Sequence, residues 1–400
     1  MYSRHNKISK FLIYIEILLI IYQSGTVQAA INANTVSFIV LRIAQMLIVT
    51  AIGIKGLMNY NALNTTIIST VLLEALAFLN WVLYPNAIFQ LQYRIVLIVL
   101  FYGMVRYCTI RNIDILEIFY NIIFVIAFYT IIFYIIIGLL KIRMPYSMMH
   151  IPGGVYYKNY FNLFYSYSIK TIPRICGLFW EPGVYQIYLN LGLFCYLKLE
   201  KKNLFQLSVL ISNILFTQST TGYMIATILC GVIIIRSKYF SRHSKIILKL
   251  MVPIFSVVLV LLVYSIKKLT TNISGDSYNV RIMDISNSLK LFMKSPLVGL
   301  GFYNTNEFMR LNDFKRGNSN GLLTWLYTTG IIGMVFALYP FFYNIKKSSD
   351  KKERLDNIIF LVYVLMINLS EPIYNLAIMT FVMAFEYFNA FNKKKKRLFQ

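Results

Sequence analysis

Residues 122–140 read IIFVIAFYTIIFYIIIGLL and contain no charged side chain. They form most of an apolar run, 113–140, which is longer than the roughly 20 residues that a helix needs to cross the hydrocarbon core of a bilayer. We therefore expect a membrane-spanning helix here, tilted to fit the membrane. If one segment crosses a membrane, the other long apolar runs of the chain are also candidates to cross it. In lipid the backbone must pair its own polar groups, so we expect these runs to be helices.

The composition also indicates a membrane protein. Hydrophobic residues make up 58% of the 400 residues and charged residues only 14%, whereas a soluble protein has about 25% charged residues. This excludes a cytosolic enzyme, a disordered chain and a small secreted scaffold. The net charge is +24, but the Lys and Arg residues occur in short clusters between apolar runs. That pattern is typical of a polytopic membrane protein with basic cytoplasmic loops, and it argues against nucleic acid as a partner.

We predict an all-α polytopic integral membrane protein with about twelve transmembrane helices, forming a single membrane domain over residues 1–400. No clean cleavage site follows the first run, so we expect it to remain in the mature chain. The predicted spans are 11–30, 36–54, 65–84, 90–105, 113–140, 181–197, 203–218, 221–236, 246–266, 319–345, 356–370 and 374–391.

Charge patterning predicts the orientation of the chain. With the N-terminus inside, clusters of Lys and Arg fall in the inside segments, whereas the short outside loops carry none. The positive-inside rule therefore predicts that both termini are cytoplasmic. Two longer outside loops, 141–180 and 267–318, are the substantial segments outside the membrane. Loops of this length are usually functional, so we expect the chemistry there.

The first outer loop, 141–180, leads into the predicted helix 181–197, and this junction holds Arg174 and Glu181. A guanidinium binds phosphate oxygens bidentately, and a carboxylate takes a proton or orients a sugar hydroxyl, so both are candidate catalytic residues. The alternative is that Glu181 only begins a helix and Arg174 anchors it at the lipid headgroups. The dense aromatic residues of this loop either stack on sugars or form an interfacial belt.

The second outer loop, 267–318, is predicted to contain a short amphipathic helix on the outer membrane surface. Ile282, Ile285 and Leu289 recur at helical spacing, with Arg281 and Asp284 on another face. Arg281, on another face of this helix near the headgroups, is the third candidate catalytic residue, because a guanidinium binds phosphate oxygens bidentately. The alternative is a surface helix without chemistry, in which Arg281 only pairs with Asp284 one turn away.

Other residues of the outside segments are candidates for substrate binding. His150 is the only histidine outside and can serve as a base, although an exposed loop histidine often has no role. Arg310 and Arg316 belong to a basic cluster before the helix at 319, where lipid headgroups are the alternative ligand. Glu371, followed by a proline, is a second carboxylate at an outside turn.

Three motifs, in this order and with this topology, resemble the O-antigen polymerase/ligase superfamily, which includes the Wzy-type polymerases. The motifs are RxxGxxxEPG at 174–183, Arg281 followed by SPLVGLG at 295–301, and SN at 319–320 with GIIG at 330–333. The predicted helix count and the two large outer loops agree with the family, so the resemblance covers most of the chain.

The resemblance implies a multi-pass enzyme of the bacterial cytoplasmic (inner) membrane. Such enzymes transfer a glycan from undecaprenyl pyrophosphate to an acceptor sugar on the outer side. Ligases of the superfamily usually carry a histidine at the position of Ser319, so we favour a polymerase of O-antigen or capsular repeat units over a ligase. Asn320, beside it, is a candidate for substrate binding. The implied partners are the undecaprenyl-pyrophosphate-linked oligosaccharide, membrane lipids, a chain-length regulator and a flippase.

No catalytic metal and no cofactor are expected. Metal-dependent lipid-linked glycosyltransferases place acidic pairs in the first outer loop, and neither such a pair there nor an Asp-x-Asp motif anywhere occurs in this sequence. The competing class is a lipid-linked oligosaccharide flippase or another transporter, which would have a similar number of helices. A transporter has no need for two long outer loops, and it usually shows repeated halves, which this sequence lacks.

Overall fold

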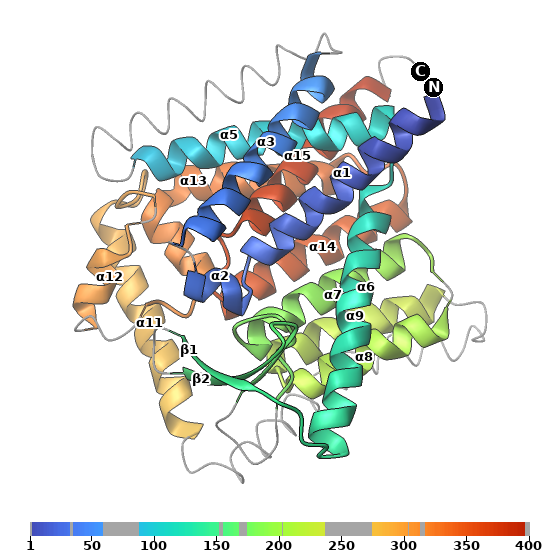
Figure 1. The fold of residues 1–400 in the computed structure, drawn as a ribbon. Coiled ribbons are helices and arrows are strands. Elements are labelled where there is room, and N and C mark those ends of the chain that lie inside the picture. The colour runs from blue at the N-terminus through green and yellow to red at the C-terminus, as the bar shows by residue number, and fades with distance from the viewer. Residues whose placement is uncertain are drawn as a thin grey trace. The chain divides into compact units, whose positions relative to one another are not determined.

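The computed structural model describes residues 2–32, 35–58, 88–151, 155–167, 174–201, 203–236, 274–302, 304–312 and 317–396. The chain forms two compact units, whose helices and strands are labelled in Figure 1. Unit 1 contains Met1–Ser24, Ile39–Ile115 and Asn279–Gln400, and unit 2 contains Gly25–Phe38 and Leu116–Tyr278.

Unit 1 is built mainly from helices. They are α1 (Tyr2–Gln23), α3 (Val36–Met58), α5 (Ile88–Ile110), α11 (Ser274–Lys294), α12 (Asn306–Leu311), α13 (Gly321–Lys346), α14 (Lys351–Ser370) and α15 (Ala377–Lys396). Helix α5 packs along α15, where the rings of Phe101 and Phe381 meet edge to face at 5.6 Å. Arg94 of α5 donates a hydrogen bond of 2.9 Å to the carbonyl of Leu376, just before α15. This charge, which falls in the predicted span 90–105, therefore has a polar partner inside the unit, as a charge in a membrane would require.

Unit 2 combines helices with a small sheet. Its elements are α2 (Val27–Asn32), α6 (Ile115–Tyr134) with a π-helical end (Ile135–Leu139), β1 (Ser147–Ile151), β2 (Val155–Tyr160), β3 (Phe164–Tyr167), α7 (Pro182–Lys198), α8 (Leu204–Thr217) and α9 (Thr220–Arg236). Helix α7 is buried on nearly all sides and packs against α8 and α9. A helix with apolar residues all around its circumference is stable only in such surroundings.

Among the described residues, three helices are long and apolar enough to cross a membrane: Val36–Met58, Ile115–Leu139 and Gly321–Lys346. Helices also occur at every other predicted span that the described residues cover. The first of these spans, 11–30, is interrupted by a turn between α1 and α2. The spans 65–84 and 246–266 lie outside the described residues, so the count of about twelve remains a prediction.

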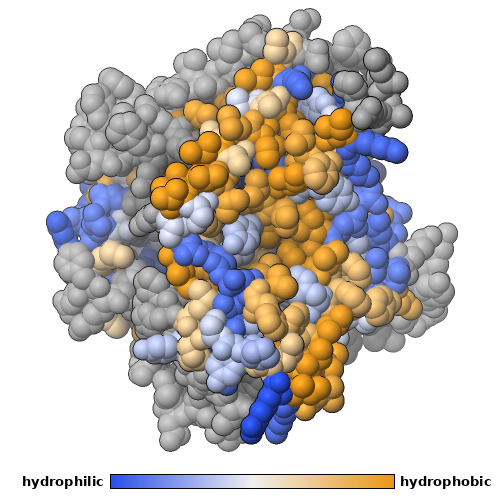
Figure 2. Space-filling view, viewed as in Figure 1, coloured by the Kyte–Doolittle hydropathy of each residue, from blue (hydrophilic) through white to orange (hydrophobic). Residues whose placement is uncertain are grey.

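Apolar side chains lie on the outside of several of these helices. Helix α3 exposes Ile39, Val40, Ile43 and Leu47, which follow one another at helical spacing along one face. Figure 2 shows broad apolar patches of this kind on the surface. Large contiguous apolar patches are rare on soluble monomers, and side chains that face lipid tails account for them.

The prediction of an all-α fold is wrong in one segment, because the predicted first outer loop contains an antiparallel sheet in the order β1-β2-β3. The sequence of β2, VYYKNY, is rich in residues that favour strands. Phe161 and Asn162 turn the chain into β3 with positive φ angles, a conformation that asparagine tolerates well. Tyr157 and Tyr165 are buried between the sheet and α2. At least these two aromatic residues therefore form a core.

Helix α13 is broken at Gly330, whose backbone is not helical (φ 65°, ψ −171°). In an unbroken helix the carbonyls of residues 327 and 328 would accept hydrogen bonds from the N–H groups of residues 331 and 332. The break at Gly330 separates these groups. Four hydrogen bonds of 2.8 to 3.1 Å join these groups instead to the segment 296–301. An unpaired backbone group in a membrane costs several kcal/mol, so the segment 296–301 is what makes the break tolerable.

Candidate functional site

A buried carboxylate links α11 to the start of α13 in unit 1. Asp284 has no exposed surface. One oxygen of its side chain, Oδ2, accepts a hydrogen bond of 3.0 Å from the backbone N–H of Ser319 and one of 2.6 Å from its hydroxyl. Hydrogen bonds to a charged acceptor are short and about twice as strong as neutral ones. The contact therefore fixes Ser319, two residues before the start of α13, against the middle of α11.

Neighbouring polar side chains complete this contact. Asn318 donates a hydrogen bond of 2.8 Å to the hydroxyl of Ser288, and its own Oδ1 accepts the N–H of Asn320 at 2.9 Å. Asn320 caps α13, because its side chain accepts the N–H of Leu323 at 3.0 Å. We call Asp284, Ser288 and residues 318–320 the α11–α13 junction. Asn320, predicted to bind substrate, is buried here and serves as the helix cap.

Arg281 lies one turn before Asp284 on α11, and its side chain is exposed. The described residues show no ion pair between the two, because the Asp284 carboxylate is directed to Ser319. The apolar residues Ile282, Ile285 and Leu289 are exposed on α11, while Asp284 is buried. The face of this helix with apolar side chains therefore points away from the unit, which is the arrangement expected of a helix that lies on a lipid surface.

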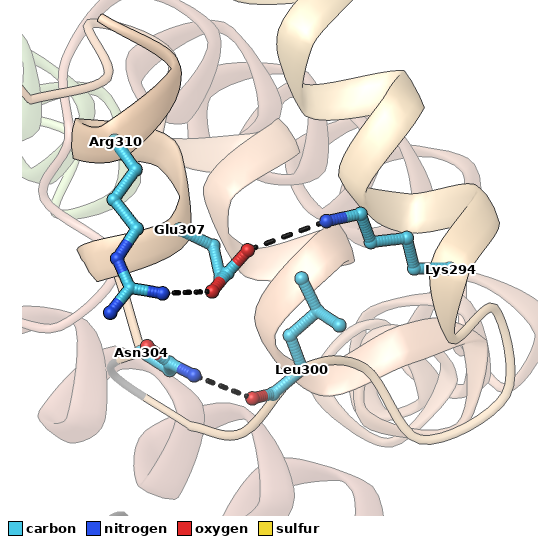
Figure 3. Close-up of polar contacts among 5 residues, drawn as sticks. All are labelled: Lys294, Leu300, Asn304, Glu307 and Arg310. Carbon is cyan, nitrogen blue, oxygen red and sulfur yellow. Dashed lines mark hydrogen bonds and ion pairs between the residues drawn. The ribbon is translucent and has the colours of Figure 1, made fainter. Parts of the chain in front are cut away.

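A second set of charges surrounds Glu307 in unit 1. Figure 3 shows Lys294 of α11 and Arg310 of α12 on either side of this carboxylate, at 3.3 and 3.0 Å. Asn304 donates a hydrogen bond of 2.9 Å to the carbonyl of Leu300 and closes the loop between the two helices. Two cations share one anion here, so the cluster keeps a net positive charge. Arg316, the other predicted member of this basic region, lies outside the described residues.

Glu371 lies at the end of α14, where its backbone is close to the start of α13. A Cβ atom built on Gly321 would lie 2.5 Å from the Glu371 carbonyl oxygen. The side chain of Glu371 is half-buried. The fold of unit 1 therefore brings Glu371 near Asn320, the residue before Gly321, although they are far apart in the sequence.

Arg174 belongs to unit 2, where it binds the end of α8. Its Nε donates to the carbonyl of Thr217 at 2.9 Å, and Nη2 donates to that of Gln218 at 3.3 Å. The last carbonyls of a helix have no partner within it and carry a partial negative charge, so an arginine there is stabilising. This role was not among the alternatives that the sequence suggested for Arg174.

Glu181, the first residue of the predicted helix 181–197, lies directly before α7, which begins at Pro182. Its side chain does not cap the helix and instead accepts a hydrogen bond of 3.1 Å from the indole N–H of Trp180. Within the described residues of unit 2, no ion pair joins Glu181 to Arg174. His150 lies in β1, where its backbone is opposite Tyr156 of β2.

The predicted catalytic residues are thus divided between the units, with Arg174 and Glu181 in unit 2 and Arg281 in unit 1. The contact between Asp284 and Ser319 was missed. The sequence does contain a signal for it: Asp284 and Ser288 lie on one face of the predicted helix together with the apolar residue Leu291, which indicates that this face is buried. The polar residues Asp284 and Ser288 of this amphipathic helix face the interior of unit 1. In the described part of the chain, no three His, Cys, Asp or Glu side chains gather in a way that could hold a metal ion.

The helices, their apolar outer surfaces and the three candidate spans define an integral membrane protein with a buried polar junction between two helices. Residues 206–338 match the family model described as O-antigen ligase. This match confirms the resemblance of that part of the chain to the O-antigen polymerase/ligase superfamily, whose members are membrane enzymes that transfer glycosyl groups. It includes Arg281, Ser319 and Gly330. No curated protein and no solved structure matches the chain.

Proposed function

We propose that this protein is a polymerase that joins undecaprenyl-pyrophosphate-linked oligosaccharide repeat units at the outer face of the bacterial cytoplasmic membrane. The observation that carries the proposal is the match of residues 206–338 to the O-antigen ligase family. Within that family we favour a polymerase, because Ser319 stands at the position where the ligases usually have a histidine. We further propose that the lipid-linked units come from a flippase and that a chain-length regulator acts with the protein.

The reaction needs little from the protein beyond orientation and charge. The donor sugar is already activated by its pyrophosphate, so the enzyme has to stabilise the departing lipid pyrophosphate and place the acceptor hydroxyl. Arg281 is exposed, carries no ion pair among the described residues and lies on a helix whose apolar face suits a membrane surface. We assign it to the leaving pyrophosphate. Arg174 and Glu181 of unit 2 remain candidate catalytic residues.

Deletion of the gene tests the proposal. Cells should then accumulate lipid-linked single repeat units and lack long polymer on gels of surface polysaccharide, because units would be made and flipped but not joined. Complementation with the intact gene should restore the ladder of polymer lengths. The proposal would be wrong if polymer were still made.

The second candidate function is a ligase, which the description of the matched family favours. A ligase transfers finished polymer from its lipid carrier to a final acceptor. Its deletion would leave lipid-linked polymer of normal length and stop the transfer to that acceptor. The same gels therefore separate the two functions, since one deletion removes the polymer and the other only its attachment.

A further inference from the structure

The α11–α13 junction places a hydroxyl between a buried carboxylate and the surface of unit 1. Asp284 is fully buried, whereas Ser319 is partly exposed. The Ser319 hydroxyl donates its proton to Asp284 at 2.6 Å. A hydroxyl has two acceptor lone pairs besides its donor, so Ser319 can accept a second proton while it gives up the first. The pair is thus arranged to move a proton inward from a bound molecule.

Anchoring of the helix start does not require this hydroxyl. The backbone N–H of Ser319 already binds the same oxygen of Asp284 at 3.0 Å. Asn318 ties the segment to Ser288, and Asn320 caps α13. The Ser319 hydroxyl is therefore an additional group on a structure that the other contacts hold in place. A group held rigidly by its surroundings is well suited to catalysis.

We infer that Ser319 and Asp284 form the base that accepts the proton of the acceptor sugar hydroxyl, an inference that rests on the proposed glycosyl transfer. In this step the acceptor oxygen forms a bond to the anomeric carbon of the donor. The bond from that carbon to the phosphate oxygen breaks, and its electron pair leaves with the lipid pyrophosphate. The acceptor proton passes to the Ser319 oxygen while the Ser319 proton passes to Asp284. Ser319 is the catalytic residue, and Asp284 is the final proton acceptor.

The test uses the full-length protein, purified in detergent, with lipid-linked repeat units extracted from the deletion strain. General-base catalysis contributes about 10²- to 10⁴-fold, so Ser319→Ala should lower kcat at least about a hundredfold and leave the donor KM unchanged. Asp284→Asn should behave in the same way. The double variant should be no slower than either single one, because the two residues act as a unit. Ser319→Thr, which keeps a hydroxyl, should retain most of the activity.

Ser286→Ala is the matched control, because Ser286 lies on α11, the helix of Asp284, and is exposed. This variant should leave kcat unchanged. The inference is overturned if Ser319→Ala keeps more than half of the wild-type kcat. It is also overturned if Ser319→Ala and Asp284→Asn lose thermal stability in proportion to their activity, because the pair would then be only structural. A wild-type protein that transfers no glycan would instead contradict the proposed function. The two failures are therefore distinguishable.

Discussion

The backbones of Gly299 and Gly330 are in direct contact: a Cβ atom built on Gly330 would lie 2.6 Å from the amide nitrogen of Gly299. Both glycines have positive φ angles, 74° and 65°. They come from two separate motifs, SPLVGLG at 295–301 and GIIG at 330–333. The two motifs are therefore parts of one structural feature, in which the first supplies the hydrogen bonds that the break in α13 leaves open.

Gly330→Ala should destabilise the protein. A side chain in this glycine-specific backbone conformation costs about 1–3 kcal/mol, and the new Cβ atom would also overlap the backbone of Leu297. Thermal unfolding in detergent should therefore occur at a clearly lower temperature. Gly317→Ala is the control, because no atom lies within 4 Å of a Cβ atom at that position. Equal melting temperatures for the two variants would contradict this account of the break.

Arg281→Ala should abolish most of the activity without affecting stability, because Arg281 is exposed and forms no ion pair with Asp284 among the described residues. Loss of one charged contact made in the transition state costs roughly 3 kcal/mol, or about a hundredfold in rate. Arg281→Lys should also lose much of the activity, since lysine lacks the planar bidentate geometry. Lys290→Ala on the same helix should be near neutral. A normally expressed Arg281→Ala protein with more than half of the wild-type polymerisation rate would remove Arg281 from the site.

Arg174→Ala should lower stability as well as activity. Its guanidinium donates to two carbonyls at the end of α8, and a hydrogen bond from a charged group contributes about 1.5–3 kcal/mol. Arg143→Ala, which changes an exposed arginine of the same unit, should leave the melting temperature unchanged. Melting temperature and polymerisation rate should be measured on the same samples. Lost activity at unchanged stability would mean that Arg174 acts on the substrate and not on the helix.

Arg310→Ala and Glu307→Gln should have opposite effects on donor binding. If the cluster in Figure 3 contacts the pyrophosphate, removal of Arg310 takes away a positive charge and raises the donor KM. Removal of the Glu307 charge releases two cations and lowers it. Both effects should shrink at high salt, because these groups are near the surface and salt screens them. Unchanged KM values in both variants would mean that the cluster does not contact the donor and that its ion pairs are ordinary surface contacts.

Cysteine labelling should place both predicted outer loops outside the membrane. Leu163→Cys and Lys290→Cys suit this test because both positions are exposed. An impermeant thiol reagent should label them in intact spheroplasts. Lys351→Cys, in a segment predicted to be inside, should react only after the membrane is opened. Protection of the first two positions in intact spheroplasts would contradict the predicted orientation.

Local sequence signals predicted the helices that the structure describes at the covered spans. An apolar run such as 122–140 has one stable arrangement in lipid, a helix that satisfies its own backbone, so α6 follows from the residues alone. The amphipathic spacing after Arg281 likewise predicted a helix, and the structure has α11 there. Glu181 and Pro182 marked the start of α7 for a similar reason, because their preferences act within one turn.

Contacts between distant segments could not be predicted in the same way. Periodicity showed that Asp284 and Arg281 share a helix, but it did not show which face of that helix is buried. The partner of Asp284 is Ser319, which lies on another segment. Arg174 presents the same difficulty. It binds backbone carbonyls at the end of α8, and every residue has a backbone carbonyl, so the side chains there do not indicate the contact.

The sequence by itself determined three properties of this protein: that its surroundings are a membrane, that its apolar runs form helices, and which superfamily its motifs resemble. These properties depend on the composition of single runs and on the order of short motifs. The tertiary structure decided that Gly299 meets Gly330 and that a buried carboxylate holds the Ser319 hydroxyl. Such contacts depend on how separate segments satisfy one another's polar groups, and no local pattern specifies that choice.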